Sequence, residues 1–291
     1  MTDCNEYPLI VASFFAAMVS ELAFASLGFG PALLYQISWR ICAVLGLSGG
    51  DLEDAVANIV VIEVPCGIVQ MVMLRRNFRA KLTVIWNLPF LAALPIGTAI
   101  LIQYGKSDWM LRELGVFFLL IVALQVYQRK RAARARGSEQ PAPKLDDEPR
   151  ALVTLGAISV ALAFSGFSRG LFGVAGPPVM VLLMCYSFAE RDVWRCISTT
   201  NRLVSCVVQG ALFASHSEIK GRCWPMYVAL MVGGLIGLGL GNLAAPHIDA
   251  KAFQRWLILF LVAGAALLIC TGSKTASTVA ASVVGLIFLT V

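Results

Sequence analysis

Six ionisable residues interrupt otherwise apolar stretches of this 291-residue chain, namely Glu21, Glu53, Asp54, Glu63, Arg169 and Arg202. Burying a charged side chain in an apolar segment is costly unless it meets an opposite charge, a substrate or a water-filled cavity. A guanidinium presents a planar fork of N–H donors that fits the oxygens of an oxyanion. Both arginines are therefore candidate anion-binding groups, and a structural ion pair with one of the acids is the alternative for Arg169. Glu21 and Glu63 are candidates for proton coupling, or else they serve to neutralise the arginines.

Polar side chains accompany one of these arginines in the sequence. The run Thr199, Thr200, Asn201 and Arg202 places several hydrogen-bond donors on one otherwise apolar stretch, and such donors can face an anion. Asn58 occupies a corresponding position in the first half of the chain. We predict that these residues form one wall of an anion-binding site.

Two interruptions rich in glycine and proline, at 26–31 and 168–178, supply a second kind of binding group. Glycine lets backbones approach closely and proline has no N–H to donate, so a helix stops and restarts at such a sequence. The freed N–H groups at the start of a half-helix attract anions. The residues predicted to line the site at these breaks, beside Arg169, are Ser26, Gly28, Gly30, Ser168, Gly170, Gly173 and Gly176.

Membrane-spanning helices are the elements that must position these residues. Hydrophobic residues make up 58% of the chain and charged residues 14%, and the mean hydropathy is +0.79. This leaves too little polar surface to cover a soluble globule, whereas roughly 20 consecutive apolar residues suffice to cross a bilayer. The predicted fold class is an all-α, multi-pass integral membrane protein.

Apolar segments divide the chain into two halves around a polar stretch. They lie at about 8–25, 31–47, 52–74, 81–103 and 109–127, then at about 151–165, 171–188, 194–216, 224–245 and 252–271. We therefore expect about ten membrane-inserted segments. The predicted division is a first repeat at 1–127, a flexible basic linker at 128–150, a second repeat at 151–274 and an extra apolar segment at 275–291.

Basic residues predict the topology. Positive charge gathers at 75–81 and again at 128–150, and loops enriched in Lys and Arg face the cytoplasm. Both loops are expected on that side, with the short joint 104–108 outside. Because this rule explains the basic run fully, no nucleic-acid partner is expected.

An internal repeat relates the two halves. Gly30-Pro31 recurs 146 residues later as Gly176-Pro177. With five inserted pieces in each half, an odd number, the second half is predicted to be inverted relative to the first. The two breaks are then expected to meet near the membrane midplane, where each satisfies the freed backbone groups of the other.

The second break also carries a family resemblance. Its sequence is Gly170-Leu171-Phe172-Gly173-Val174-Ala175-Gly176-Pro177-Pro178, which resembles the G-L-F-G-x-G-G-P-P pattern of the TauE/SafE family of sulfite and organosulfonate exporters. The resemblance extends from about residue 8 to residue 271. It implies export of a small sulfur-containing anion, such as sulfite or sulfoacetate, across the plasma (inner) membrane. The implied partners are this anion and membrane lipids, with a homo-oligomer left open.

Other classes of function find little support in the sequence. It has no paired Asp motif, no H-E-x-x-H and no Ser and His pair at membrane depth, so no enzyme and no catalytic residue is predicted. The eight Cys residues lack paired metal spacing and are interpreted as small packing residues, with no metal site or cofactor. Gly233, Gly237 and Gly241 are predicted to pack helices closely. An anion channel, or a transporter of a different small anion, remains the alternative.

Overall fold

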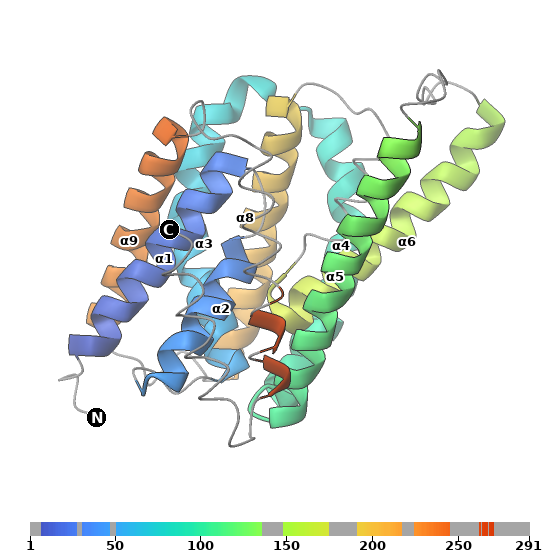
Figure 1. Cartoon of the computed structure of the whole chain (residues 1–291). Helices are drawn as coiled ribbons and strands as arrows, with labels where there is room; N and C mark the ends of the chain where they lie inside the picture. The colour runs from blue at the N-terminus through green and yellow to red at the C-terminus, as the bar shows by residue number, and fades with distance from the viewer. Residues whose placement is uncertain are drawn as a thin grey trace. The chain divides into compact units, whose positions relative to one another are not determined.

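The structure, a computed structural model, describes residues 7–27, 31–46, 51–135, 148–174, 191–216 and 224–244, with 262, 264–266 and 268–270. Within these residues every regular element is helical, as predicted. The elements, labelled in Figure 1, are α1 (Tyr7–Leu27), α2 (Pro31–Val44), α3 (Leu52–Leu74), the 3-10 turn η1 (Arg75–Asn77), α4 (Ala80–Tyr104), α5 (Asp108–Ala135), α6 (Glu148–Phe172), α8 (Arg191–Ser215) and α9 (Trp224–Ala244).

Four helices in the described part of the chain are long and apolar enough to cross a membrane. They cover Tyr7–Ala25, Leu52–Asn77, Thr83–Tyr104 and Trp224–Ala244. Their outward faces carry exposed apolar side chains, for example Val84 and Leu88 on α4, while Ser13, Ser20 and Thr98 are buried. Apolar exteriors around polar interiors are what a lipid solvent favours. Ten inserted segments remain a prediction, and 275–291 lies outside the described residues.

In the first half the described helices stop and restart on either side of 28–30, which lie outside the described residues, and in the second half the helix runs further than expected. Helix α1 ends at Leu27 and α2 starts at Pro31, where a proline is tolerated because the first N–H of a helix has no partner within it. In the second half we expected an apolar segment to end at about 165, but α6 continues through Gly166 and Gly170 to Phe172. The prediction was wrong for 166–172 because these glycines serve close packing within a continuous helix.

Helix α5 also runs further than its apolar segment. It continues to Ala135, so the start of the stretch predicted to be a flexible linker is helical. The residues of this extension are mostly Arg, Lys, Gln and Ala, which have high helix propensity. Residues 136–147 lie outside the described part, and α6 begins at Glu148.

The helices group into two compact units, each drawing on both halves of the sequence. Unit 1 comprises the described parts of Met1–Ile59, Gln103–Val126 and Gly221–Val291, and unit 2 those of Val60–Ile102 and Tyr127–Lys220. The inverted relationship of the two sequence halves stays a prediction.

A glycine seam joins α1 and α9 in unit 1 (Figure 1). Gly233, Gly237 and Gly241, one turn apart on α9, lie directly against the backbone of α1. A Cβ at Gly237 would fall 2.9 Å from the Cα of Met18, and closer still to the Met18 carbonyl oxygen. The predicted packing role of these three glycines is confirmed.

A second glycine seam joins α4 and α6 in unit 2. Gly166 lies against the backbone of Phe90, and Gly170 lies against Leu94 and Thr98. A Cβ at Gly170 would fall 2.7 Å from the backbone nitrogen of Thr98. The end of α6 is therefore held close to α4, immediately beside Arg169.

Candidate functional site

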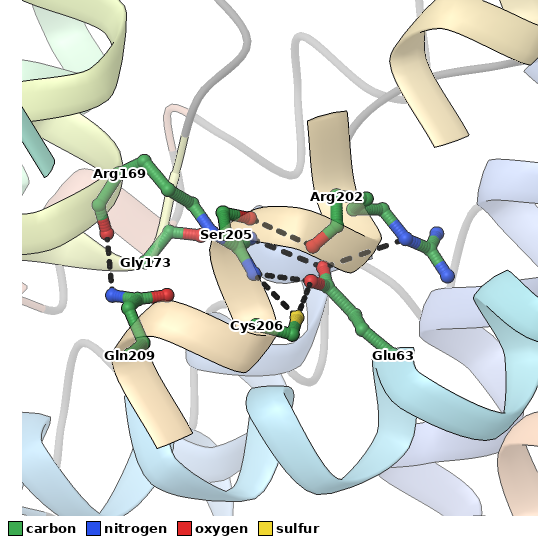
Figure 2. Close-up of polar contacts among 7 residues, drawn as sticks. All are labelled: Glu63, Arg169, Gly173, Arg202, Ser205, Cys206 and Gln209. Atoms are coloured by element: carbon green, nitrogen blue, oxygen red, sulfur yellow. Dashed lines mark hydrogen bonds and ion pairs between the residues drawn. The ribbon is translucent and has the colours of Figure 1, made fainter. Parts of the chain in front are cut away.

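A buried cluster of charged side chains lies within unit 2 (Figure 2). Glu63 comes from α3, Arg169 from the last turn of α6, and Arg202 and Cys206 from α8. The residues are almost sealed from solvent, with relative exposures of 1% for Glu63, 2% for Arg169 and 7% for Arg202. Charges this deeply buried persist only with partners of opposite charge or with hydrogen bonds to every charged group.

Arg169 uses its terminal nitrogens as a fork. Nη1 donates to Glu63 Oε1 at 3.1 Å and to the carbonyl oxygen of Gly173 at 2.7 Å. Nη2 forms the closest contact of the cluster, with Glu63 Oε2, and also donates to Cys206 Sγ at 3.4 Å. These four bonds account for the four terminal N–H groups of the guanidinium. The fifth donor, Nε, is buried and has no hydrogen-bond partner among the residues that the structure describes.

Glu63 receives contacts from α8 as well. The Cys206 thiol donates to Glu63 Oε2 at 3.1 Å, and Arg202 Nε lies 4.0 Å from Glu63 Oε1. The Glu63 carboxylate therefore faces the guanidinium groups of both Arg169 and Arg202. Because the Arg202 contact is at the outer limit of an ion pair, Arg169 is the dominant partner of Glu63.

Local backbone structure fixes the position of Arg169. Gly173 has a φ of 70°, in the left-handed region that glycine adopts most readily. Its N–H donates to the carbonyl oxygen of Arg169 at 2.8 Å, which closes the end of α6 in a left-handed cap. Gln209 Nε2 donates to the same carbonyl at 3.1 Å. The glycine of the second break thus ends the helix and turns its own carbonyl towards the arginine.

A glycine also lies between α3 and α8 near the cluster. A Cβ at Gly67 would lie 2.8 Å from the Leu203 side chain, whereas a Cβ at Gly210 would make ordinary contact with Val60 at 3.5 Å. Gly67 therefore permits a close approach of α8 one turn after Glu63 along α3.

The structure brings together only part of the predicted site. Glu63, Arg169, Gly173 and Arg202 converge. Ser168 instead donates to the Phe164 carbonyl at 2.8 Å on its own helix, and Gly170 lies against α4. On α8, Thr199 is buried, Asn201 is half-buried, and Thr200 donates to the Cys196 carbonyl at 2.9 Å and to Met71 Sδ at 3.5 Å.

The remaining predicted residues belong to unit 1 or fall outside the described residues. Glu21 and Asn58 are fully buried in unit 1, and Ser26 lies in the last turn of α1. Gly28, Gly30 and Gly176 lie outside the described residues. The predicted meeting of the two breaks involves these same residues, so it stays a prediction.

Two residues of the cluster were not predicted from the sequence to belong to the site. Cys206 was interpreted as a packing residue, but its thiol bonds to Glu63, and Gln209 bonds to the Arg169 backbone. Both follow Arg202 at helical spacing, four and seven residues later, so the three share one face of α8. That periodicity of polar residues was the available signal.

A search of curated proteins and a search of solved structures each gave no significant match. The family model for "Sulfite exporter TauE/SafE" matches residues 9–268, which cover every helix described above apart from the first two residues of α1. Its match agrees with the resemblance carried by the second break and with the four apolar helices. The chain therefore belongs to the sulfite exporter TauE/SafE family of integral membrane transporters.

Proposed function

We propose that this protein exports a small sulfur-containing oxyanion, sulfite or an organosulfonate such as sulfoacetate, across the plasma (inner) membrane. The anion binds beside Arg169 and Arg202 in unit 2. In this proposal Thr199, Thr200 and Asn201 of α8 contribute polar side chains beside the two arginines.

One observation carries the proposal, namely that two buried guanidinium groups, those of Arg169 and Arg202, gather at the Glu63 carboxylate within unit 2. Cationic groups gathered in a region of low exposure suit a bound anion, which would offset part of their desolvation cost. The buried Nε of Arg169 adds an N–H donor for which the described residues supply no acceptor.

The geometry of the donors matches a sulfur oxyanion better than a spherical halide. Guanidinium groups bind oxyanions through pairs of parallel N–H···O bonds. Sulfite and sulfonate groups each present three oxygens on one sulfur, so two arginines can engage different oxygens of one group. Each charged hydrogen bond of this kind contributes about 1.5–3 kcal/mol.

Flux into proteoliposomes tests the proposal. Sulfite, sulfate, thiosulfate, sulfoacetate and taurine would be screened with wild-type protein, and we expect saturable flux of at least one of them. The variant R202Q should lower transport at limiting substrate about tenfold or more, since one charged hydrogen bond is lost.

The variant R76Q is the matched control because it removes the same charge from an exposed arginine in η1. It should transport like the wild type. No flux of any of these anions, or equal flux in R202Q and the wild type, would refute the proposal. Flux that rises without saturation would favour the channel instead.

A further inference from the structure

Gln70 is a buried glutamine of α3 that takes no part in the charged cluster. The residue is 1% exposed, and neither Oε1 nor Nε2 has a hydrogen-bond partner among the residues that the structure describes. Each buried polar atom without a partner costs free energy, and such atoms are rare in folded proteins. Gln70 therefore indicates that a polar group binds beside it.

Helical spacing places Gln70 on the same side of α3 as Glu63. The two residues are seven positions apart, which is close to two turns, or roughly 10 Å along the helix axis. Both belong to unit 2. The unpartnered amide therefore lies on the face of α3 that carries the Glu63 carboxylate, two turns closer to η1.

Contacts between α3 and α8 place this glutamine level with Arg202. A Cβ at Gly67 would lie 2.8 Å from Leu203, and one turn later Thr200 Oγ1 donates to Met71 Sδ at 3.5 Å. The glutamine lies between these two contacts along α3. It is therefore level with the turn of α8 that carries Arg202, and closer to this arginine along the helices than Glu63 alone would indicate.

The chemistry of an amide restricts what can bind there. In either orientation the Gln70 side chain presents one oxygen that accepts and one nitrogen that donates. Sulfonate and carboxylate oxygens only accept, and an ammonium group only donates. A hydroxyl group does both, so it satisfies the oxygen and the nitrogen of the amide together.

We propose that Gln70 forms a second subsite, which binds a hydroxyl group of the transported organosulfonate while the sulfonate lies at Arg169 and Arg202. A short carbon chain between sulfonate and hydroxyl suits two binding groups at the same level of facing helices. The inference rests on the proposed function, and it names the substrate class of the same site as short hydroxyalkanesulfonates.

Binding of two matched sulfonates to the purified full chain tests the inference. Isethionate carries a terminal hydroxyl where 1-propanesulfonate carries a methyl group, and the two agree in charge and in chain length. Calorimetric titration of the wild type should give a dissociation constant about tenfold lower for isethionate, because one hydrogen bond forms and the amide of Gln70 is no longer left unsatisfied.

The variant Q70M keeps the length of the side chain and removes both polar atoms. It should lose the preference for isethionate and bind 1-propanesulfonate at least as tightly as the wild type does. Without ligand, Q70M in detergent should unfold at the wild-type temperature or above it, since no hydrogen bond is lost and no unpaired amide stays buried. Q36M is the matched control, because Gln36 is a buried glutamine of α2 in unit 1. Folded Q36M should keep the preference.

Equal dissociation constants for the two sulfonates in the wild type, or a preference for isethionate that persists in Q70M, would overturn the inference and leave the proposed function standing. Saturable sulfite flux without binding of either sulfonate would do the same. A clear loss of stability in ligand-free Q70M would also overturn it, by showing that a structural partner already satisfies the amide. If no anion of the flux screen is transported and neither sulfonate binds, the proposed function fails and the inference fails with it.

Discussion

Two glycine seams of the same construction differ in what lies beside them. In unit 1, Gly233, Gly237 and Gly241 of α9 lie against the backbone of α1. In unit 2, Gly166 and Gly170 of α6 lie against the backbone of α4. Helix α6 also carries Arg169 next to Gly170, and this arginine reaches Glu63 of α3. In the repeat alignment, the corresponding position of α1 is Ala23, which is buried.

This difference distinguishes glycines that only pack helices from side chains that could bind an anion. Close helix approach through glycine serves packing in both units, so glycine at membrane depth does not by itself indicate a binding role. In unit 2 the charged side chains of Glu63, Arg169 and Arg202 gather at the end of such a seam, whereas the buried acid beside the seam of unit 1, Glu21, lies on the seam helix α1 itself. We therefore propose that the cluster binds the anion and that the α4–α6 seam holds Arg169 in place.

The largest expected effect comes from breaking the buried ion pair of unit 2. R169M leaves the Glu63 carboxylate without its dominant partner, and removing one member of a buried pair costs about 3–5 kcal/mol of stability. The double variant E63M/R169M removes both charges, and apolar replacements of buried pairs are often neutral or stabilising. Thermal unfolding in detergent, followed by tryptophan fluorescence, should show a large loss in R169M and recovery in the double variant.

Neither variant should bind the transported anion. A double variant that regains stability and still binds anion with wild-type affinity would show that the cluster only supports the fold. Recovery of stability without recovery of binding separates the two roles.

The next largest loss of stability is expected from substitutions in the two glycine seams. G237A in unit 1 and G170A in unit 2 each force a methyl group against backbone atoms, and overpacking of this kind costs about 1–3 kcal/mol. G239A and G156A are matched controls on the same helices, since a Cβ there meets nothing within 4 Å. They should be neutral or slightly stabilising, because alanine favours helix by about 1 kcal/mol over glycine.

Anion affinity should distinguish the two seam variants. Folded G237A should bind anion like the wild type, whereas G170A should bind more weakly, because its clash displaces the turn that carries Arg169. Equal affinities in G170A and G237A would show that the α4–α6 seam does not position the site.

A smaller effect is expected at the cap of α6. Gly173 has a positive φ and accepts a bond from Arg169 through its carbonyl. G173A places a Cβ in a backbone conformation that costs about 1 kcal/mol for residues other than glycine. We expect a modest loss of stability and a several-fold weaker anion affinity. G46A tests the alternative that any positive-φ glycine has this effect, since Gly46 has a φ of 74° at the turn after α2 and belongs to unit 1.

Several features of this fold could be predicted because they depend on local sequence. Long apolar runs identified the helices, Pro31 located the restart of a helix, and the four-residue spacing of Gly233, Gly237 and Gly241 identified a packing face. The motif at 170–178 identified the family. In each case the signal lies within one segment and needs no knowledge of its neighbours.

The remaining features depend on contacts between distant segments. Glu63 and Arg169 are 106 residues apart, so the sequence offered two acids and two arginines without showing their pairing. Gly166 and Gly170 suit a helix break as well as close packing, and only the backbone of α4 decides between these roles. In the sequence alone Cys206 resembles a packing residue, because nothing there shows that the Glu63 carboxylate lies beside it.

The dissociation constant of thiosulfate at neutral pH, measured in E63Q and R202Q, tests the central claim most directly. If the cluster binds the anion, the two substitutions must act in opposite directions. R202Q removes a donor and a positive charge, so binding should weaken about tenfold or more. E63Q removes the carboxylate that competes for the arginines, so binding should tighten. Changes in the same direction, or no change in either variant, would contradict the account.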